Sequence, residues 1–171
     1  MKTEYLSAAD TAKLVRKALA EAFPGVKFSV RSKTYSGGAS IDVRWTDGPN
    51  SKQVEAVAKR FEGSDFDGMI DLKSSLPTMF EGRRVRFGAD FVFCTREFSD
   101  ALVSKALAST ARKWGVEQIP TVADWKAGRL NGANLGGSWD FGRDLWLDLG
   151  KRSDRLVVLP SPTAAAACLA E

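Results

Sequence analysis

Residues 7–23 carry apolar side chains at the three- and four-residue intervals of an α-helix. Ser7 stands where it can cap the first turn, and Asp10, three residues later, is its capping-box partner. A second stretch with the same spacing begins at Asn50, has Gln53 at the reciprocal position and ends at a glycine. The pattern therefore predicts two amphipathic helices in the first part of the chain.

The period changes to two between these helices. Apolar positions alternate with polar ones, and the apolar set is Val26, Phe28, Val30, Ile41, Val43 and Trp45. This alternation predicts an antiparallel pair of strands with one buried face. Residues Tyr35 to Gly38 form the predicted turn, where Gly37 and Gly38 supply positive φ angles. We expect the two helices to cover the apolar face of this pair.

The segments that follow are less regular. The stretch "DFDGMIDLKSS" predicts a further short strand through Met69, Ile70 and Leu72. Residues 74–83 are expected to form a joint, because they contain a proline and a glycine and show no clear period. The stretch "RRVRFGADFVFCTREF" then has strand character.

A third amphipathic helix is predicted from its cap at Ser99 to a glycine stop, and Thr121 with Asp124 can cap a short helix. The glycine-rich "GRLNGANLGGSWDFGRDLW" predicts an ordered loop, "RLVVLP" a last strand, and "SPTAAAACLAE" a frayed tail or a weak helix. The predicted fold class is α+β, an αββα unit with an antiparallel sheet, extended by a C-terminal strand–helix segment. We expect the αββα domain over residues 1–75 and the extension, packed on it, over residues 84–171.

The composition narrows the function classes. The chain has 171 residues, a net charge of +4 and a pI near 9.2, which argues against a mimic of DNA. Two cysteines, Cys94 and Cys168, without any histidine cannot build a disulfide framework or a zinc site. We expect two free thiols in a reducing compartment, and a single disulfide between them is the alternative. The first residues lack the apolar core of a signal peptide, and no apolar run is long enough to span a membrane. We therefore expect a cytoplasmic protein.

No motif for catalysis or metal binding is apparent. The lack of histidine excludes a Ser-His-Asp triad, and Cys94 follows a strand-like stretch, which favours a buried structural thiol. The group Asp65, Asp67 and Asp71 lacks the remaining ligands and the glycine of a calcium loop, and "NGANLGG" lacks the lysine and hydroxyl of a phosphate loop. No feature points to a paired-carboxylate hydrolase. We therefore predict a protein without enzymatic activity, cofactor or metal.

Basic residues form the strongest remaining signal. Lys27, Arg31, Lys33 and Arg44 share the polar side of the predicted strand pair, where only Asp42 opposes them. A second cluster follows the joint and consists of Arg83, Arg84 and Arg86. Such residues can hold phosphates, and Tyr35 at the turn can stack on a base. The alternative is that this side is a solvated surface, because half-exposed sheets are often rich in lysine and arginine.

Residues 4–75 resemble a known family. The stretches that carry the resemblance are "AADTAKLVRKALAEAFPGVKFSVRSKTYSGG", "IDVRWTDGP" and "VEAVAKRFEGSDFDGMIDL". They are similar to the large polyvalent protein-associated domain of type twenty-nine, which occurs in proteins of phages and conjugative elements. The resemblance implies a protein that enters a new host with the DNA of its element and helps the element to survive there. The family has no established catalytic residues, so the resemblance assigns none.

Two hypotheses about function follow. The first is a binding protein of a phage or plasmid that counters a host defence system, as an anti-CRISPR or antirestriction protein does, through contacts with a host protein or ribonucleoprotein. The second is an accessory protein that binds DNA or RNA through the basic side of the strand pair. Trp125, Trp139 and Trp146 are candidate anchors for a protein partner, although burial in the core is the alternative that we favour for each.

Overall fold

The computed structural model describes residues 3–69, 72–137, 140–154 and 157–169 of the chain. Its internal contacts divide the chain into two compact units. The first, which we call the sheet unit, joins residues 1–96 to residues 155–171, and the second, the helical unit, spans residues 97–154.

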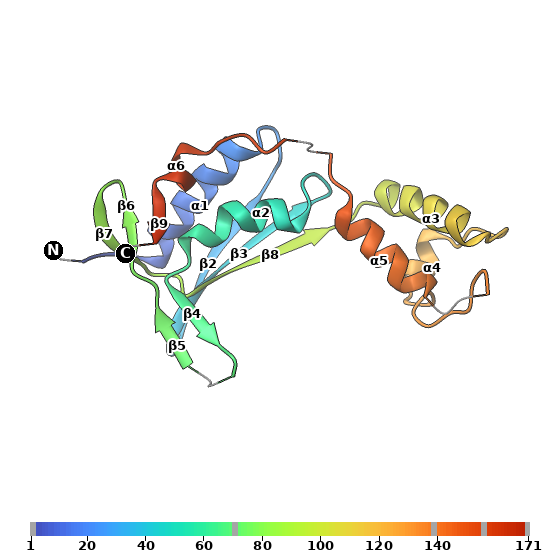
Figure 1. Cartoon of the computed structure of the whole chain (residues 1–171), viewed down its shortest axis with the longest axis horizontal. Helices are drawn as coiled ribbons and strands as arrows, with labels where there is room; N and C mark the ends of the chain where they lie inside the picture. The colour runs from blue at the N-terminus through green and yellow to red at the C-terminus, as the bar shows by residue number, and fades with distance from the viewer. Residues whose placement is uncertain (1–2, 70–71, 138–139, 155–156, 170–171) are drawn as a thin grey trace. The chain divides into compact units, whose positions relative to one another are not determined.

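A three-stranded sheet with the order β2–β3–β8 crosses the sheet unit (Figure 1). Strands β2 (Ser29–Tyr35) and β3 (Gly38–Thr46) are the predicted antiparallel pair. Strand β8 (Phe91–Glu97) lies beside β3 and runs in the same direction, which the pattern did not predict. The direction follows from two hydrogen bonds, one from Asp90 N to Ala39 O near the start of both strands and one from Arg96 Nε to Asp47 O near their ends.

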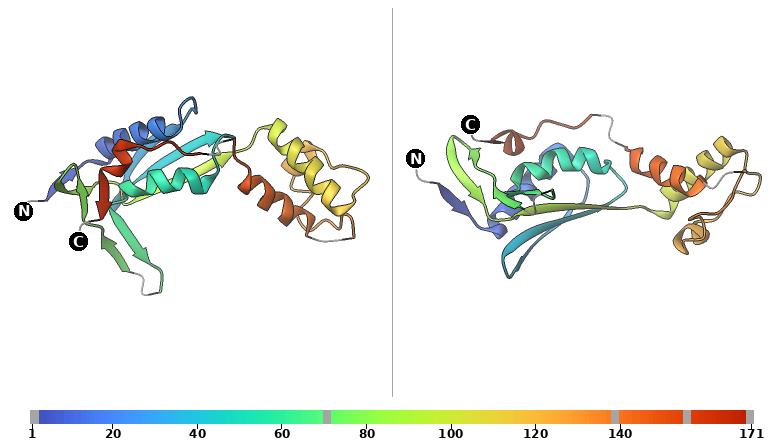
Figure 2. Two further views of the ribbon diagram at one scale, coloured as in Figure 1. Left: turned by 45° about the horizontal axis from the view of Figure 1, so that its top comes forward. Right: turned by 60° about the horizontal axis from the view of Figure 1, so that its bottom comes forward.

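Two helices cover one face of this sheet (Figure 2). Helix α1 (Ala8–Ala22) begins where Ser7 Oγ accepts a hydrogen bond from Asp10 N. Helix α2 (Ser51–Ala58) begins with the predicted capping box between Asn50 and Gln53 and continues into the short 3₁₀ helix η1 (Lys59–Phe61). The helices and the sheet enclose one core, which includes Val15, Leu19, Phe23, Val30, Ile41, Val43, Trp45, Val54 and Phe61. The predicted covered face is therefore confirmed.

The tight turn of the hairpin differs from the prediction in one detail. Gly37 adopts the positive φ angle of +93°, but Gly38 does not and is already the first residue of β3. Gly38 instead faces the carboxylate of Asp90, and an added Cβ atom would collide with it. A close approach, and not a positive φ angle, is therefore the physical reason for glycine at this position.

A second sheet with the order β1–β7–β6–β9 lies at the end of the sheet unit that contains both chain termini (Figure 1). Its strands are β1 (Glu4–Leu6), β6 (Thr78–Phe80), β7 (Arg83–Phe87) and β9 (Ala167–Leu169). The expected joint over residues 74–83 thus contains strand β6. The segment expected to be a frayed tail or a weak helix contains a short helix, α6, and contributes strand β9. Both strands are too short to show a period of their own, and pairing with distant neighbours stabilises them.

The C-terminal segment is anchored to α1 through Glu21. Its carboxylate accepts hydrogen bonds from Ser161 Oγ, Thr163 N and Thr163 Oγ1, at 2.7, 3.0 and 2.8 Å. These bonds hold the first turn of helix α6 (Pro162–Ala165), which leads into β9. The described residues of the predicted strand "RLVVLP", 157–160, are not a strand, because Leu159 N bonds to Ala22 O at the end of α1 instead of to a sheet.

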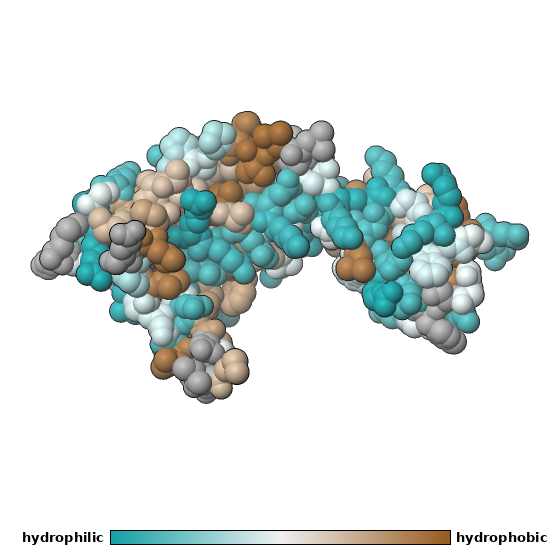
Figure 3. Space-filling view, in the orientation of Figure 1, coloured by the Kyte–Doolittle hydropathy of each residue, from teal (hydrophilic) through white to brown (hydrophobic). Residues whose placement is uncertain are grey.

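A two-stranded hairpin replaces the single short strand that was expected after α2. Strands β4 (Ser64–Asp67) and β5 (Leu72–Ser75) pair antiparallel, and Met69 lies in the connection between them. Ile70 of the predicted strand lies outside the described residues. The apolar side chains of Phe66, Met69 and Leu72 are exposed, and apolar surface is visible on this hairpin in Figure 3.

The helical unit has its own core. Helix α3 (Asp100–Trp114) runs from the predicted cap Ser99 to Gly115, and α4 (Val122–Lys126) has the predicted capping box of Thr121 and Asp124. The expected glycine-rich loop is present over residues 128–137, but its last part is wrong, because helix α5 (Phe141–Lys151) begins within the segment and packs its apolar residues on α3. The buried set is Val103, Ala106, Leu107, Ala111, Leu130, Phe141, Leu145 and Leu149.

The α+β class is confirmed, since the chain combines helices with largely antiparallel sheets. The compact units do not coincide with the expected ranges 1–75 and 84–171, because β6, β7, β8 and β9 all belong to sheets of the sheet unit. Among the described residues, no helix has the length and apolar character that crossing a membrane requires.

Candidate nucleic-acid interface

Three predicted cations share the face of the β2–β3–β8 sheet that is opposite to α1 and α2. Arg31 and Lys33 lie on β2 and Arg44 lies on β3, and all three are exposed. Arg31 stands opposite Asp42 in the antiparallel register, and Arg44 stands opposite Ser29. Since paired residues point to the same side of a sheet, Arg31, Lys33 and Arg44 project from one face. We call this surface the open face.

Two further predicted residues border the open face. Lys27 is exposed and precedes β2 by one residue. Tyr35 is the last residue of β2 and is 47% exposed. Its ring lies against Gly38, where an added Cβ atom would be 3.2 Å from Tyr35 Cε2, so the ring rests on the backbone of the turn.

Strand β8 adds two aromatic side chains that the sequence did not assign to a site. Val92 is buried and Cys94 packs against the core, so the alternation turns Phe91 and Phe93 to the open face. The two rings contact each other with centroids 6.3 Å apart, and Phe93 is 53% exposed. The alternation of side chains in "FVFCTRE" could have indicated that Phe91 and Phe93 share one face, but the sequence does not tell which side of β8 is covered.

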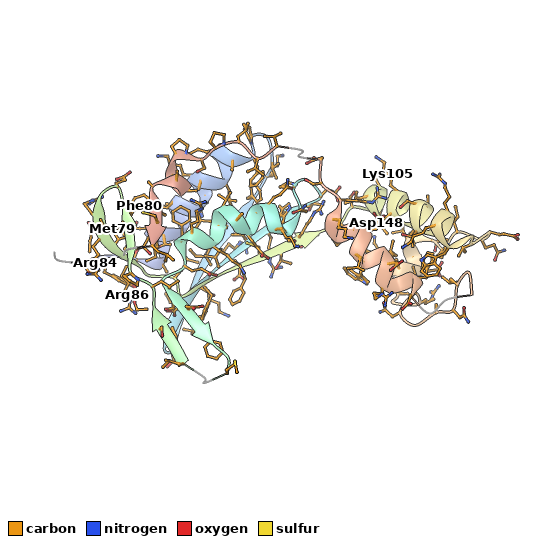
Figure 4. The ribbon with its side chains drawn as sticks, in the orientation of Figure 1. Met79, Phe80, Arg84, Arg86, Lys105 and Asp148 are labelled. Carbon is orange, nitrogen blue, oxygen red and sulfur yellow. The ribbon has the colours of Figure 1, made fainter. Side chains whose placement is uncertain are left out.

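The second basic cluster is divided between two faces of the β1–β7–β6–β9 sheet. Arg84 pairs with Met79 and Arg86 with Tyr5 in the register, so Arg84 and Arg86 project from the exposed side (Figure 4). Arg83 points to the other side and forms ion pairs with Glu4 at 2.9 Å and Glu81 at 3.5 Å. Because these acids neutralise Arg83, only Arg84 and Arg86 remain available for an anion.

Asp90 connects the open-face hairpin to the β4–β5 hairpin. Its buried carboxylate accepts hydrogen bonds from Ala39 N at 3.1 Å and Ser64 Oγ at 2.8 Å, and it pairs with Lys73 at 2.7 Å. Burial alone raises the pKa of Asp90, but the hydrogen bonds from Lys73, Ser64 and Ala39 outweigh burial and lower it. Asp90 therefore holds the turn end of the open face in place as a charged group.

A hollow of about 470 Å³ opens beside this carboxylate. Its polar lining includes Ser32, Thr34, Lys73, Arg86 and Asp90. The ion pair of Lys73 with Asp90 leaves Arg86 as the cation that is not neutralised inside the hollow. The hollow therefore has little net charge with which to hold an anion.

The described residues show no arrangement of side chains suited to thiol chemistry or to metal binding. Burial raises the pKa of Cys94 to about 12, so its thiol is neutral at physiological pH. No group of three or more histidine, cysteine or acidic side chains in the described part of the chain is placed to hold a metal ion. Of the acidic residues considered above as a calcium loop, Asp65 accepts a hydrogen bond from Phe66 N, while Asp71 and the side chain of Asp67 lie outside the described residues.

The helical unit presents an aromatic cluster. Phe98, Trp125 and Trp146 have ring centroids 5.6 to 6.4 Å apart. Trp146 is 50% exposed, contrary to the favoured burial, because helix α5 turns its buried face toward α3 and leaves Trp146 and Leu147 on the surface. Trp139 lies outside the described residues.

Comparison with known proteins gives one match. A family model described as large polyvalent protein associated domain 29 matches residues 6–99, which is more than half of the 171 residues. The match includes α1, the β2–β3–β8 sheet and α2, and thus every residue of the open face. No curated protein and no solved structure matched the chain.

Proposed function

The chain belongs to the large polyvalent protein associated domain 29 family, and from this premise we propose that it is a nucleic-acid-binding accessory protein of a mobile genetic element. The family is one of domains associated with polyvalent proteins of phages and other mobile elements. The open face is the binding surface in this proposal. Its ligand is DNA or RNA of the element or of the host.

The observation that supports the proposal is the concentration of uncompensated positive charge on the open face. Among the described residues, Arg31, Lys33 and Arg44 have no ion-pair partner, whereas Lys13, Lys73 and Arg83 elsewhere in the sheet unit do. Asp42 is the acidic side chain between them. The open face thus presents three cations on two adjacent strands beside one carboxylate, and such cations can hold phosphates.

The charges set the expected salt dependence. Three cations can neutralise at most three phosphates, so the slope of log affinity against log salt is about −2.1 for single strands and about −2.7 for duplexes. Raising the salt from about 50 to about 200 mM therefore weakens binding by about 15- to 40-fold. A protein interface anchored by an aromatic side chain changes much less over the same range.

The test is fluorescence anisotropy with labelled single- and double-stranded DNA and RNA at both salt concentrations. The variant carries Arg31→Gln, Lys33→Gln and Arg44→Gln. The matched control carries Lys52→Gln, Lys105→Gln and Arg112→Gln, which remove the same charge at exposed positions of α2 and α3. We expect the control to keep the affinity and the salt slope, and the open-face variant to lose both. Absence of binding by the unaltered protein at the lower salt concentration would refute the proposal.

A second candidate function is the evasion of a host defence system through protein contacts. The exposed Trp146 and Leu147 on α5 favour it, because an exposed tryptophan on a helix is a frequent anchor of protein interfaces. The test is the plating efficiency of a phage on hosts with a CRISPR or restriction system, with and without the protein. We expect Trp146→Ser to abolish any protection that depends on α5, and the open-face triple variant to leave that protection intact.

A further inference from the structure

We propose that the open face binds single-stranded nucleic acid, with unpaired bases stacked on Phe93 and Tyr35 and phosphates held by Arg31, Lys33 and Arg44. This inference rests on the proposed function and specifies the form of its ligand. It depends on where β8 places its phenyl rings, which the tertiary structure decides.

The exposure of aromatic rings on this face is the first observation. Phe93 from β8 and Tyr35 from β2 are exposed on the same sheet surface as the three cations, and the half-buried Phe91 contacts Phe93 there. The core takes up other aromatic side chains of the sheet unit, as the contacts of Phe61 and Phe80 with Phe87 show. An exposed phenyl ring gives up the stabilisation that burial provides, and beside three cations such a ring offers a face on which an unpaired base can stack.

The separation of charges and rings is the second observation. The three cations lie on β2 and β3, whereas Phe91 and Phe93 lie on the neighbouring strand β8. Neighbouring strands are about 5 Å apart, so Arg44 on β3 lies one strand away from the rings of β8, and Arg31 and Lys33 on β2 lie two strands away. Tyr35 lies at the turn end of β2, on the side of the cations. An extended single strand can place its phosphates on these cations and its unpaired bases on Phe93 and Tyr35.

A duplex does not fit this surface as well. Its bases are stacked on one another, so their faces are not available to Phe93 or Tyr35, and it would use only the cations. A three-stranded sheet is also wider than the helix or the two-stranded ribbon that the major groove admits. Base stacking therefore favours single strands over duplexes on the open face.

Asp42 is consistent with this assignment. It stands opposite Arg31 at the centre of the face and offsets part of the positive charge there. A surface designed only for a dense line of phosphates would not contain a carboxylate at its centre, because the like charges repel. A carboxylate can, however, accept hydrogen bonds from the amino groups of an unpaired base.

The test compares Phe93→Leu with the matched control Phe66→Leu. Both positions are half-exposed, at 53% and 50%, and Phe66 lies on the β4–β5 hairpin. The probes are labelled oligomers of about 16 nucleotides, the upper size of a small single-strand site, as poly-dT, poly-U, and a mixed DNA sequence alone and in duplex form. The DNA and RNA probes distinguish the two possible sources of the ligand, and far-UV circular dichroism verifies that both variants are folded.

We expect the unaltered protein to bind single strands at least tenfold more tightly than the duplex. Loss of one stacking ring should weaken single-strand binding by about 5- to 150-fold, while Phe66→Leu leaves it unchanged. Weaker single-strand binding by Tyr35→Leu, with Phe66→Leu unchanged, supports stacking at the turn. Equal or tighter binding of the duplex, or an equal effect of both leucine variants, overturns the inference and leaves the proposed function standing. Failure of every probe to bind at about 50 mM salt overturns both.

Discussion

Replacement of Asp90 by alanine should lower the free energy of unfolding of the sheet unit by about 2–6 kcal/mol. The carboxylate is 11% exposed and accepts hydrogen bonds from Ala39 N and Ser64 Oγ, in addition to its ion pair with Lys73. In the alanine variant, the buried N–H of Ala39 and the buried hydroxyl of Ser64 lose the carboxylate as their hydrogen-bond acceptor. Each such group costs about 1–3 kcal/mol, whereas the amine of Lys73, which is 38% exposed, can turn to water at little cost.

The Asp90→Asn variant distinguishes the contribution of the negative charge to stability from that of the hydrogen bonds. The amide oxygen can still accept one of the two buried hydrogen bonds, so we expect a smaller loss, about 1–2 kcal/mol at pH 7. Because the folded-state pKa of Asp90 is lowered, the stability that the charge contributes is present above the unfolded pKa and is lost as the pH falls through the folded pKa. The difference between the wild type and Asp90→Asn should therefore shrink below about pH 4.

Urea denaturation followed by tryptophan fluorescence measures these differences. Asp65→Ala on the adjacent strand β4 is the control, because Asp65 is exposed and should leave the transition nearly unchanged. An unfolding free energy of Asp90→Ala within about 1 kcal/mol of the wild type would show that water replaces the carboxylate, and that Asp90 does not hold the two hairpins together.

Three further predictions follow from the same contacts. Burial raises the pKa of Cys94 to about 12, so Cys94 should react with a thiol reagent at pH 8 much more slowly than the exposed Cys168. Mass spectrometry measures both rates, and equal rates would contradict the burial of Cys94. Glu21→Ala should speed amide hydrogen exchange in β9, because three hydrogen bonds to the C-terminal segment are lost. The control Glu55→Ala on α2 should leave this exchange unchanged. Unchanged exchange in Glu21→Ala would show that Glu21 does not anchor the C-terminal segment. Phe87→Ala should lower the unfolding free energy by about 3–5 kcal/mol, because the ring of Phe87 is buried between Phe61 and Phe80. Phe93→Ala should lower it by less than about 1 kcal/mol, because Phe93 is exposed. A larger loss for Phe93→Ala than for Phe87→Ala in urea denaturation would contradict the assignment of faces.

The candidate site was predictable in part. Alternation placed Arg31, Lys33 and Arg44 on one side of a strand pair, and the structure places them on one exposed face. The cluster of Arg83, Arg84 and Arg86 was not one surface, because adjacent residues of a strand point to opposite sides. Phe93 was recognised only as a strand residue, since its exposure depends on which side of β8 the helices cover.

Local chemistry determined the parts of the fold that the sequence alone predicts. Capping residues and periodicity located α1, α2, α3 and α4, and the alternation with the glycine turn located β2 and β3, because these signals act between residues a few positions apart. Tertiary structure decided the rest. Strands β1, β6 and β9 have three residues each, and their stability comes from partners far away in the chain, such as Thr78 with both Val85 and Leu169. The aromatic half of the open face was decided in the same way, because only packing against β3 and the core determines which side of β8 faces solvent.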